Sequence, residues 1–364
     1  MEVRAMPIHF TEERMRKSID AHDRWWRGVL GRPLIRASIT DAYPRGPKPK
    51  APILAQENVH DFSWTPEEVV EALEWELESF EYLGDAYPVV DLAPFGPGVL
   101  AAMCGARLDN SSGRVWFFPC EKDVTKLHIR YDPENKWTRR IKDICRAGVQ
   151  RWQGSVIITM PDLGGILDVI ASMCGTENLL YATMDEPEEV HRLILEAEQA
   201  WQEAYADFAA ILAPQGCMTN WNGILSAGST YIPQCDFAYM IGPDMFREFV
   251  LETLRRDTER IDNTIYHLDG IGQLAHVDML LSLPKLKAIQ WVPGGGKPGP
   301  EAWPELYEKV CAAGKNIMIV GDGRTNGSLE LLPKLGEKIY CGIWASAAER
   351  EDVIRYLKAM GVMR

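Results

Sequence analysis

The sequence predicts an α/β fold, a (β/α)8 TIM barrel, because short apolar runs alternate with helical patterns along most of the chain. Such alternation implies parallel strands joined by right-handed crossovers, and eight strand-helix units most simply close into a barrel. An open doubly wound sheet is the alternative, but no Gly-x-Gly-x-x-Gly follows the first strand-like run. The eight strand-like runs are 34–39, 87–92, 156–161, 217–222, 264–268, 287–292, 316–321 and 338–343.

We expect one barrel domain over residues 1–364 with two additions. The first is an N-terminal helical extension, 1–33, with a helix at 11–30 that Thr11 can cap. The second is a small β-hairpin insertion at 104–132, because the stretches RVWFFP and KLHIRYD alternate in polarity. Further helices are predicted at 64–85, 133–150, 183–212, 242–261 and 346–360.

Charge and composition limit the partners and the compartment. A formal net charge of −13 argues against a nucleic-acid partner, and no apolar run approaches the length of a membrane span. The eight cysteines are scattered singly without a Cys-x-x-Cys, which is typical of reduced thiols. The first residues lack the apolar segment of an export signal. We therefore expect a cytoplasmic protein, and a homodimer is compatible with the sequence.

Three residues with metal-ligand chemistry lie near the downstream ends of predicted strands. His267 and Asp269 are two positions apart on one strand, so their side chains point to the same side. Cys341, on the last predicted strand, adds a third zinc-competent group. These residue types also have ordinary structural roles. A His-x-Asp pair is as often a hydrogen-bonded pair, and a single cysteine in an apolar strand is more often a core residue.

Other candidate site residues also lie at or near strand ends, where barrel enzymes place their sites. Asp236 can bind substrate or orient His267, and it could equally well cap the N-terminus of a helix. The aromatic members of the set could clamp a flat ring or surround a quaternary ammonium, although packing alone accounts better for each one taken singly. The candidate substrate-binding residues are Phe95, Asp162, Trp221, Asn222, Tyr231, Cys235, Gln290, Trp291 and Trp344.

The second half of the chain resembles the uroporphyrinogen decarboxylase superfamily, which includes corrinoid-dependent methyltransferases. The similar stretches are FAYMIGPDMFREFVLETLRR, YHLDG, LKAIQW, AAGKNIMI and YCGIWASAAEREDVIRYLKAM. In the methyltransferase branch, zinc is held by a His-x-Cys motif on one strand and by a distant cysteine. The resemblance matches His267 to the first ligand and Cys341 to the last, and it places Asp269 where that branch has its middle cysteine.

The resemblance implies a zinc-dependent methyltransferase that moves a methyl group between a small methylated substrate and a corrinoid. The substrate would be an aryl methyl ether, an alcohol or a methylamine. A carboxylate in place of a thiolate makes zinc a stronger Lewis acid, which favours a methyl donor over a thiol acceptor. The chain has no Asp-x-His-x-x-Gly signature of its own, so the corrinoid (cobalamin) would be presented by a partner protein.

Two alternatives stay open, as does the direction of methyl transfer. The superfamily's decarboxylases are metal-free lyases that hold substrate carboxylates with an arginine-rich loop after the first strand. Arg36 and Arg45 are present here, but the compact Arg-Gln-Ala-Gly-Arg type of loop is not. The other alternative is a non-catalytic barrel that binds a small molecule.

Overall fold

The computed structural model describes residues 8–327, 331 and 335–363, and it has a mixed α/β fold. A seven-stranded sheet has the order β2-β1-β11-β10-β9-β8-β7, in which only β2 runs antiparallel to its neighbour. The strands are β1 (Leu34–Thr40), β2 (Glu81–Gly84), β7 (Thr230–Tyr231), β8 (Asn263–Asp269), β9 (Ala288–Val292), β10 (Asn316–Asp322) and β11 (Ile339–Ser346).

A second parallel pair continues the strand sequence beyond this sheet. It joins β3 (Val89–Val90) and β6 (Ile157–Ile158), and the Met160 amide donates to the carbonyl of Thr219 in the next predicted strand. The last strand, β11, pairs with the first, β1, as the barrel prediction requires. An α/β fold with a parallel sheet is thus confirmed. No ladder joins β1 to β3 in the described residues, so closure into a barrel stays a prediction.

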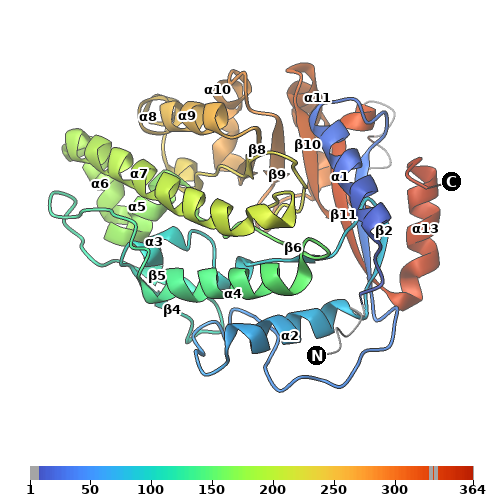
Figure 1. Cartoon of the computed structure of the whole chain (residues 1–364). Coiled ribbons are helices and arrows are strands. Elements are labelled where there is room, and N and C mark those ends of the chain that lie inside the picture. Colours follow the sequence, from blue (N-terminus) through green and yellow to red (C-terminus); the bar gives the residue numbers. More distant parts are fainter. Residues whose placement is uncertain (1–7, 328–330, 332–334, 364) are drawn as a thin grey trace.

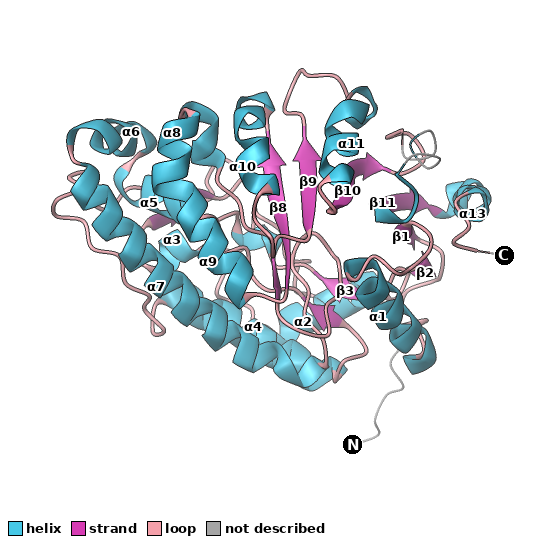
Figure 2. Ribbon diagram, turned by 90° about the horizontal axis from the view of Figure 1, so that it is seen from above, coloured by secondary structure: helices cyan, strands magenta, loops and turns pink. Residues whose placement is uncertain are grey.

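Helices surround the strands in Figure 2, and α2, α4 and α7 form a layer along one side in Figure 1. The main apolar core fills the space between these helices and the sheet. The helices are α1 (Glu12–Trp26), α2 (Pro66–Leu77), α3 (Leu100–Met103), α4 (Lys136–Trp152), α5 (Ile166–Cys174), α6 (Thr176–Asp185), α7 (Pro187–Leu212), α8 (Pro243–Phe246), α9 (Glu252–Arg260), α10 (Val277–Leu281), α11 (Pro304–Ala312) and α13 (Arg350–Ala359).

Helix α1 covers the amino ends of the strands. Trp25 is fully buried, and its indole N–H donates to the carbonyl of Ile339, the first residue of β11, at 3.1 Å. Trp26 donates to the carbonyl of Leu225 at 2.9 Å. Because the amino ends are covered by apolar packing, the carboxyl ends remain for a site. The buried residues of this cluster are Ala21, Trp25, Trp26, Leu30, Leu34, Ile224, Ile232, Ile265, Ala288 and Tyr340.

Several predicted elements differ from the structure, and the strands expected at 87–92 and 156–161 are only two residues long. The helix expected at 64–85 ends at Leu77, because the following Phe-Glu-Tyr-Leu stretch joins the edge of β1 as β2 and buries Tyr82. The hairpin pairs β4 (Arg107–Asp109) with β5 (Trp116–Phe118), whereas KLHIRYD forms no strand.

The predicted strand at 217–222 is reduced to one isolated bridge, between Met218 and Ser226. Side-chain oxygens replace the ladder here: Asn220 Oδ1 accepts from the Asn222 amide, and Asn222 Oδ1 accepts from the Ile224 amide. Such local hydrogen bonds compete with strand pairing.

Two further features of the described residues bear on the expected partners. None of their helices combines the length and apolarity needed to cross a membrane. All eight cysteines lie in the described part of the chain, and none forms a disulfide.

The burial of Trp25 makes α1 a strong contributor to stability. Trp25→Ala removes a fully buried indole and leaves a cavity, so the free energy of unfolding should fall by about 3–5 kcal/mol in urea denaturation. Trp116→Ala is the control, because that side chain is 58% exposed and its loss should change stability by less than about 1 kcal/mol. Equal losses in both variants would contradict a stabilising role for the buried helix.

Candidate functional site

The structure brings three predicted residues together at the carboxyl end of β8. His267 and Asp269 project from the same face of this strand, and Asp236 follows β7 at the start of a 3-10 helix. One ligand atom from each residue lies within 4.8 Å of the others, and the distance from His267 Nε2 to Asp269 Oδ2 is 3.7 Å. Two carboxylates and an imidazole at this spacing can hold one divalent cation.

Strand pairing fixes the orientation of His267. Its partner in the β8–β9 register is Gln290, whose side-chain oxygen accepts a hydrogen bond from His267 Nδ1. The amide nitrogen of Gln290 is directed to the sulfur of Met318, at 3.1 Å, which fixes the amide orientation. Nδ1 therefore carries the proton, and the lone pair of Nε2 faces the two carboxylates. Trp221 packs edge-on against the imidazole, with ring centroids 5.1 Å apart.

The electrostatics of the cluster favour a cation. Burial alone would lower the pKa of His267, but the neighbouring carboxylates of Asp269 and Asp236 and the hydrogen bond to Gln290 together raise it. Burial and the charge of Asp269 raise the pKa of Asp236, against the opposing effect of His267. A positive ion between the two carboxylates would relieve their repulsion. The side chain of Asp269 is 39% exposed, so one side of the cluster stays open.

Two further carboxyls lie near the cluster. Asp168 on α5 accepts hydrogen bonds from the backbone amides of Asp236 and Phe237, at 3.0 and 2.9 Å, and so positions Asp236. Asp168 was not predicted from the sequence, because its hydrogen bonds to the amides of Asp236 and Phe237 join segments that are 68 or 69 residues apart in the chain. Asp162 accepts from the Gly164 amide at 2.9 Å and from the Gln234 side chain, and burial raises the pKa of Asp162 to about 6.

Two hollows meet at Asp236. One, of about 620 Å³, is bounded by the hairpin residue Trp116, by Met240 and by Asp168. The other, of about 390 Å³, is bounded by Asp269 and by the glycine-rich loop at 293–297. The cluster is therefore reachable from outside along both hollows.

A third cavity, of about 480 Å³, lies on the other side of Trp221. Trp221 and Trp344, two of the predicted aromatic residues, both line it. Trp344 is 64% exposed and packs edge-on against Phe80. Arg36 of β1 also lines this cavity, although the sequence pointed to it only for the decarboxylase alternative. The sequence does contain a signal for this position: Arg36 is the one charged residue in an apolar strand, and a charged side chain there must face either solvent or a polar cavity.

Cys341 does not lie with His267 and Asp269, which corrects the predicted ligand set. Its side chain is fully buried with Ile343 and Ala345 against α13, and its sulfur is 3.8 Å from the hydroxyl of Tyr356. Alternate residues of a strand point to opposite faces, and Cys341 is on the helix-covered face of β11. The structure thus brings Asp236, not Cys341, to the pair on β8.

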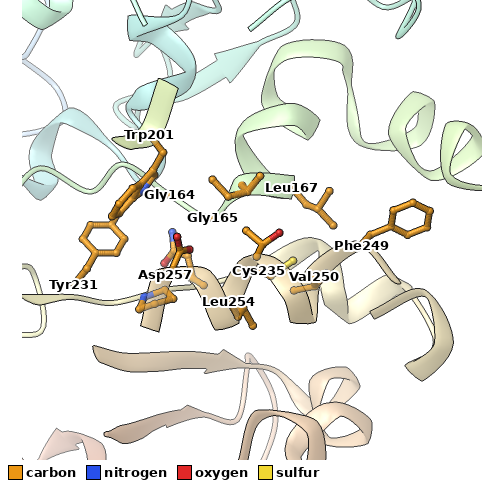
Figure 3. Close-up of a pocket in the computed structure, with 14 residues that line it drawn as sticks. Gly164, Gly165, Leu167, Trp201, Tyr231, Cys235, Phe249, Val250, Leu254 and Asp257 are labelled. Atoms are coloured by element: carbon orange, nitrogen blue, oxygen red, sulfur yellow. The ribbon is translucent and has the colours of Figure 1, made fainter. Parts of the chain in front are cut away.

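Several predicted substrate-binding residues are also outside the site. Trp291 is buried beneath α11 against Trp303, and Phe95 is buried in the main core. Tyr231 and Cys235 line a separate pocket of only about 20 Å³, which Figure 3 shows between Trp201 and α9. That volume holds about one water molecule, so the pocket is too small for a substrate. Asn222 is buried, and its carbonyl accepts from the hydroxyl of Tyr340 at 2.8 Å.

Comparisons with known proteins show the fold. No protein-family model matches the sequence, and no curated protein matches it. Among solved structures, the chain is similar to a methyltransferase from Methanosarcina mazei, with a TM-score of 0.59 and 12% sequence identity. The similarity covers 94% of this chain and 98% of that chain. At this identity the two proteins share a fold, and their activities need not agree.

The buried carboxyl of Asp162 predicts a pH dependence of stability. Because the pKa of Asp162 is higher in the folded state, its protonation adds stability at low pH, and this contribution is lost as the pH rises through about 6. Asp162→Asn keeps the acceptor oxygen without the charge. Between pH 7.5 and 4.5 the wild type should therefore gain about 2 kcal/mol relative to the variant, measured by urea unfolding. A difference that does not change with pH would show that Asp162 does not titrate in this way.

Proposed function

We propose that this chain is a metal-dependent methyltransferase, closed as a (β/α)8 barrel, that exchanges a methyl group between a small methylated substrate and a partner protein's corrinoid. The observation that carries the proposal is the cluster of Asp236, His267 and Asp269 at the carboxyl end of β8. In barrel enzymes this end of the strands holds the reacting groups. The shared fold with a methyltransferase supports the same choice.

The donor set of the cluster fits zinc. Catalytic zinc sites commonly have three protein ligands from His and Asp or Glu and leave a further position for water or substrate. Asp236, His267 and Asp269 would hold the ion, and Gln290 would keep Nε2 of His267 available to it. Two carboxylates donate less charge to zinc than two thiolates. When bound, zinc supplies a Lewis acid for the leaving oxygen or nitrogen, and a reduced corrinoid supplies the methyl acceptor.

The chain's own residues would orient the substrate and shield it from water. Trp221 packs against the imidazole of His267 and also lines the 480 Å³ cavity, so a substrate held in that cavity would lie one side chain away from the cluster. The 620 Å³ hollow gives a partner's cofactor a route to Asp236 from outside. Exposed Trp116 and Met240 at this hollow are apolar side chains suited to a protein contact.

A metal-free lyase of the decarboxylase type is the second candidate function. The observation in its favour is Asp162, because burial raises its pKa to about 6 and it can hold a proton at neutral pH more readily than an ordinary carboxyl. Such a group could protonate a carbanion after loss of carbon dioxide. This activity would persist after all metal is removed.

Metal analysis distinguishes the ligand set of Asp236, His267 and Asp269 from the set predicted from the sequence, in which Cys341 takes the place of Asp236. The wild type should bind about one zinc ion per chain, and Asp236→Asn, His267→Ala and Asp269→Asn should each weaken binding by more than about 100-fold. Gln290→Leu should cost about 10- to 100-fold, since it only orients His267. Cys341→Ala is the matched control and should bind zinc as the wild type does. Loss of zinc in the Cys341 variant alone would overturn the assignment.

Methyl transfer is tested with reduced cobalamin in solution as the acceptor. We expect the zinc-loaded wild type to methylate it from one class among aryl methyl ethers, alcohols and methylamines, measured by absorbance and by mass spectrometry of the demethylated product. His267→Ala should lower the rate by at least about 100-fold, and Cys341→Ala should retain it. Metal-loaded enzyme that transfers no methyl group from any class would exclude the proposal. Release of carbon dioxide by metal-free enzyme would support the lyase instead.

A further inference from the structure

The cavity lined by Trp221 contains a positive charge that forms no ion pair with any acid of the described residues. Arg36 lines this cavity, and no carboxylate in the described part of the chain lies within 4.0 Å of its guanidinium. Nη1 of Arg36 donates to the hydroxyl of Tyr340 at 3.3 Å, whereas the buried Nε finds no acceptor among the described residues. Charged groups removed from water are costly unless they are paired, so a guanidinium in this setting calls for an anion.

The backbone is shaped to hold Arg36 in this position. The guanidinium lies over the ring of Tyr87, 4.6 Å from its centroid. Gly223 provides the necessary space, because a Cβ atom at this position would overlap Nη1 of Arg36. If Arg36 moved to a solvent-facing rotamer, it would lose its contact with the ring of Tyr87 and leave the space at Gly223 unfilled.

Two more donors without acceptors belong to the same wall. Asn220 and Trp221 line the cavity with Arg36, and within the described residues neither Asn220 Nδ2 nor Trp221 Nε1 has a hydrogen-bond partner. The orientation of the Asn220 amide is set by its oxygen, which accepts from the Asn222 amide at 3.0 Å. All three unpartnered groups are N–H donors, so they share a need for an acceptor.

The acidic residues of the cavity meet this need only in part. Asp322 is paired with Arg324. Asp91 accepts from the Ala93 amide and the Thr159 hydroxyl through one oxygen, and its charge helps to raise the pKa of Arg36, although the two residues form no ion pair. Glu76 also lines the cavity, and burial raises its pKa. The remaining wall is mainly apolar and includes the rings of Phe80 and Trp344 and the side chains of Leu54, Leu73 and Leu77.

We propose that Arg36, Asn220 and Trp221 form a binding site for the carboxylate of a flat aromatic compound. A carboxylate accepts hydrogen bonds on two oxygens and suits the planar guanidinium, while the apolar wall and the volume of about 480 Å³ suit an aromatic ring. The site stands whether or not methyl transfer is the reaction. Under the proposed function, it would select aromatic carboxylates among the methylated donors.

Calorimetric titration of the full-length protein with benzoate and benzamide tests this site. The two probes have nearly the same shape and differ in charge, so a protein with a net charge of −13 should prefer benzoate only through a local positive site. We expect benzoate to bind at least about tenfold more tightly than benzamide. Equal affinities, or no benzoate binding at concentrations on the order of 10 mM, would overturn the proposal.

Variants assign the preference to Arg36. Arg36→Gln should remove the preference for benzoate, whereas Arg16→Gln, a matched loss of one charge at a 72% exposed side chain, should leave it unchanged. Trp221→Phe keeps a ring but loses the N–H, and it should weaken benzoate more than benzamide if Arg36→Gln fails to fold. Benzoate binding that survives Arg36→Gln would mean that the metal cluster or another site holds the carboxylate, and would refute the assignment.

Discussion

The pairing of β8 with β9 is the constraint on which the site depends. Their register sets His267 beside Gln290, and the amide of Gln290 in turn fixes which imidazole nitrogen carries the proton. With the proton on Nδ1, the other nitrogen becomes a lone-pair donor directed at Asp236 and Asp269. A slip of one residue between these strands would turn the histidine away from its acids. The chemistry of the cluster is thus a property of sheet register as much as of residue type.

Asp236 depends on a different kind of support, because it does not come from a strand. It lies at the start of a short 3-10 helix, where two backbone amides would otherwise lack acceptors, and Asp168 accepts from both. This bond ties the segment after β7 to α5 and brings a third carboxylate close to the first two. The negative charge collected in this way is costly unless a cation or protons offset it. The positive counterpart, Arg36, is on the far side of Trp221 and pairs with none of these acids.

Strand positions could be predicted from the sequence more easily than the faces that their residues occupy. Most apolar runs were placed correctly, and His267 and Asp269 share a face because their spacing of two requires it. The same rule separates Gln290 from Trp291, so both cannot face one ligand, and the structure buries the tryptophan beneath α11. Cys341 was expected to face the same ligand as His267, but it lies on the opposite face of its strand, because α13 packs against that face of β11.

What lay beyond prediction was contact between distant segments. Nothing in the sequence around Asp236 indicates that Asp168 would hold it, because the two are joined only by the folded arrangement of α5. The segment at 217–222 was mistaken for a regular strand because its apolar pattern outweighed its asparagines, whose side chains instead bond the nearby backbone.

The covering of the strands' amino ends by α1 affects the order in which molecules can arrive. With Trp25 and Trp26 packed across that end, the cavity and the cluster are approached from the carboxyl side of the strands. A large partner seated over that side would close the entrance to anything small. If a corrinoid protein binds there as proposed, the small molecule would have to enter before it, and the kinetics would show a compulsory order with that protein as the second reactant.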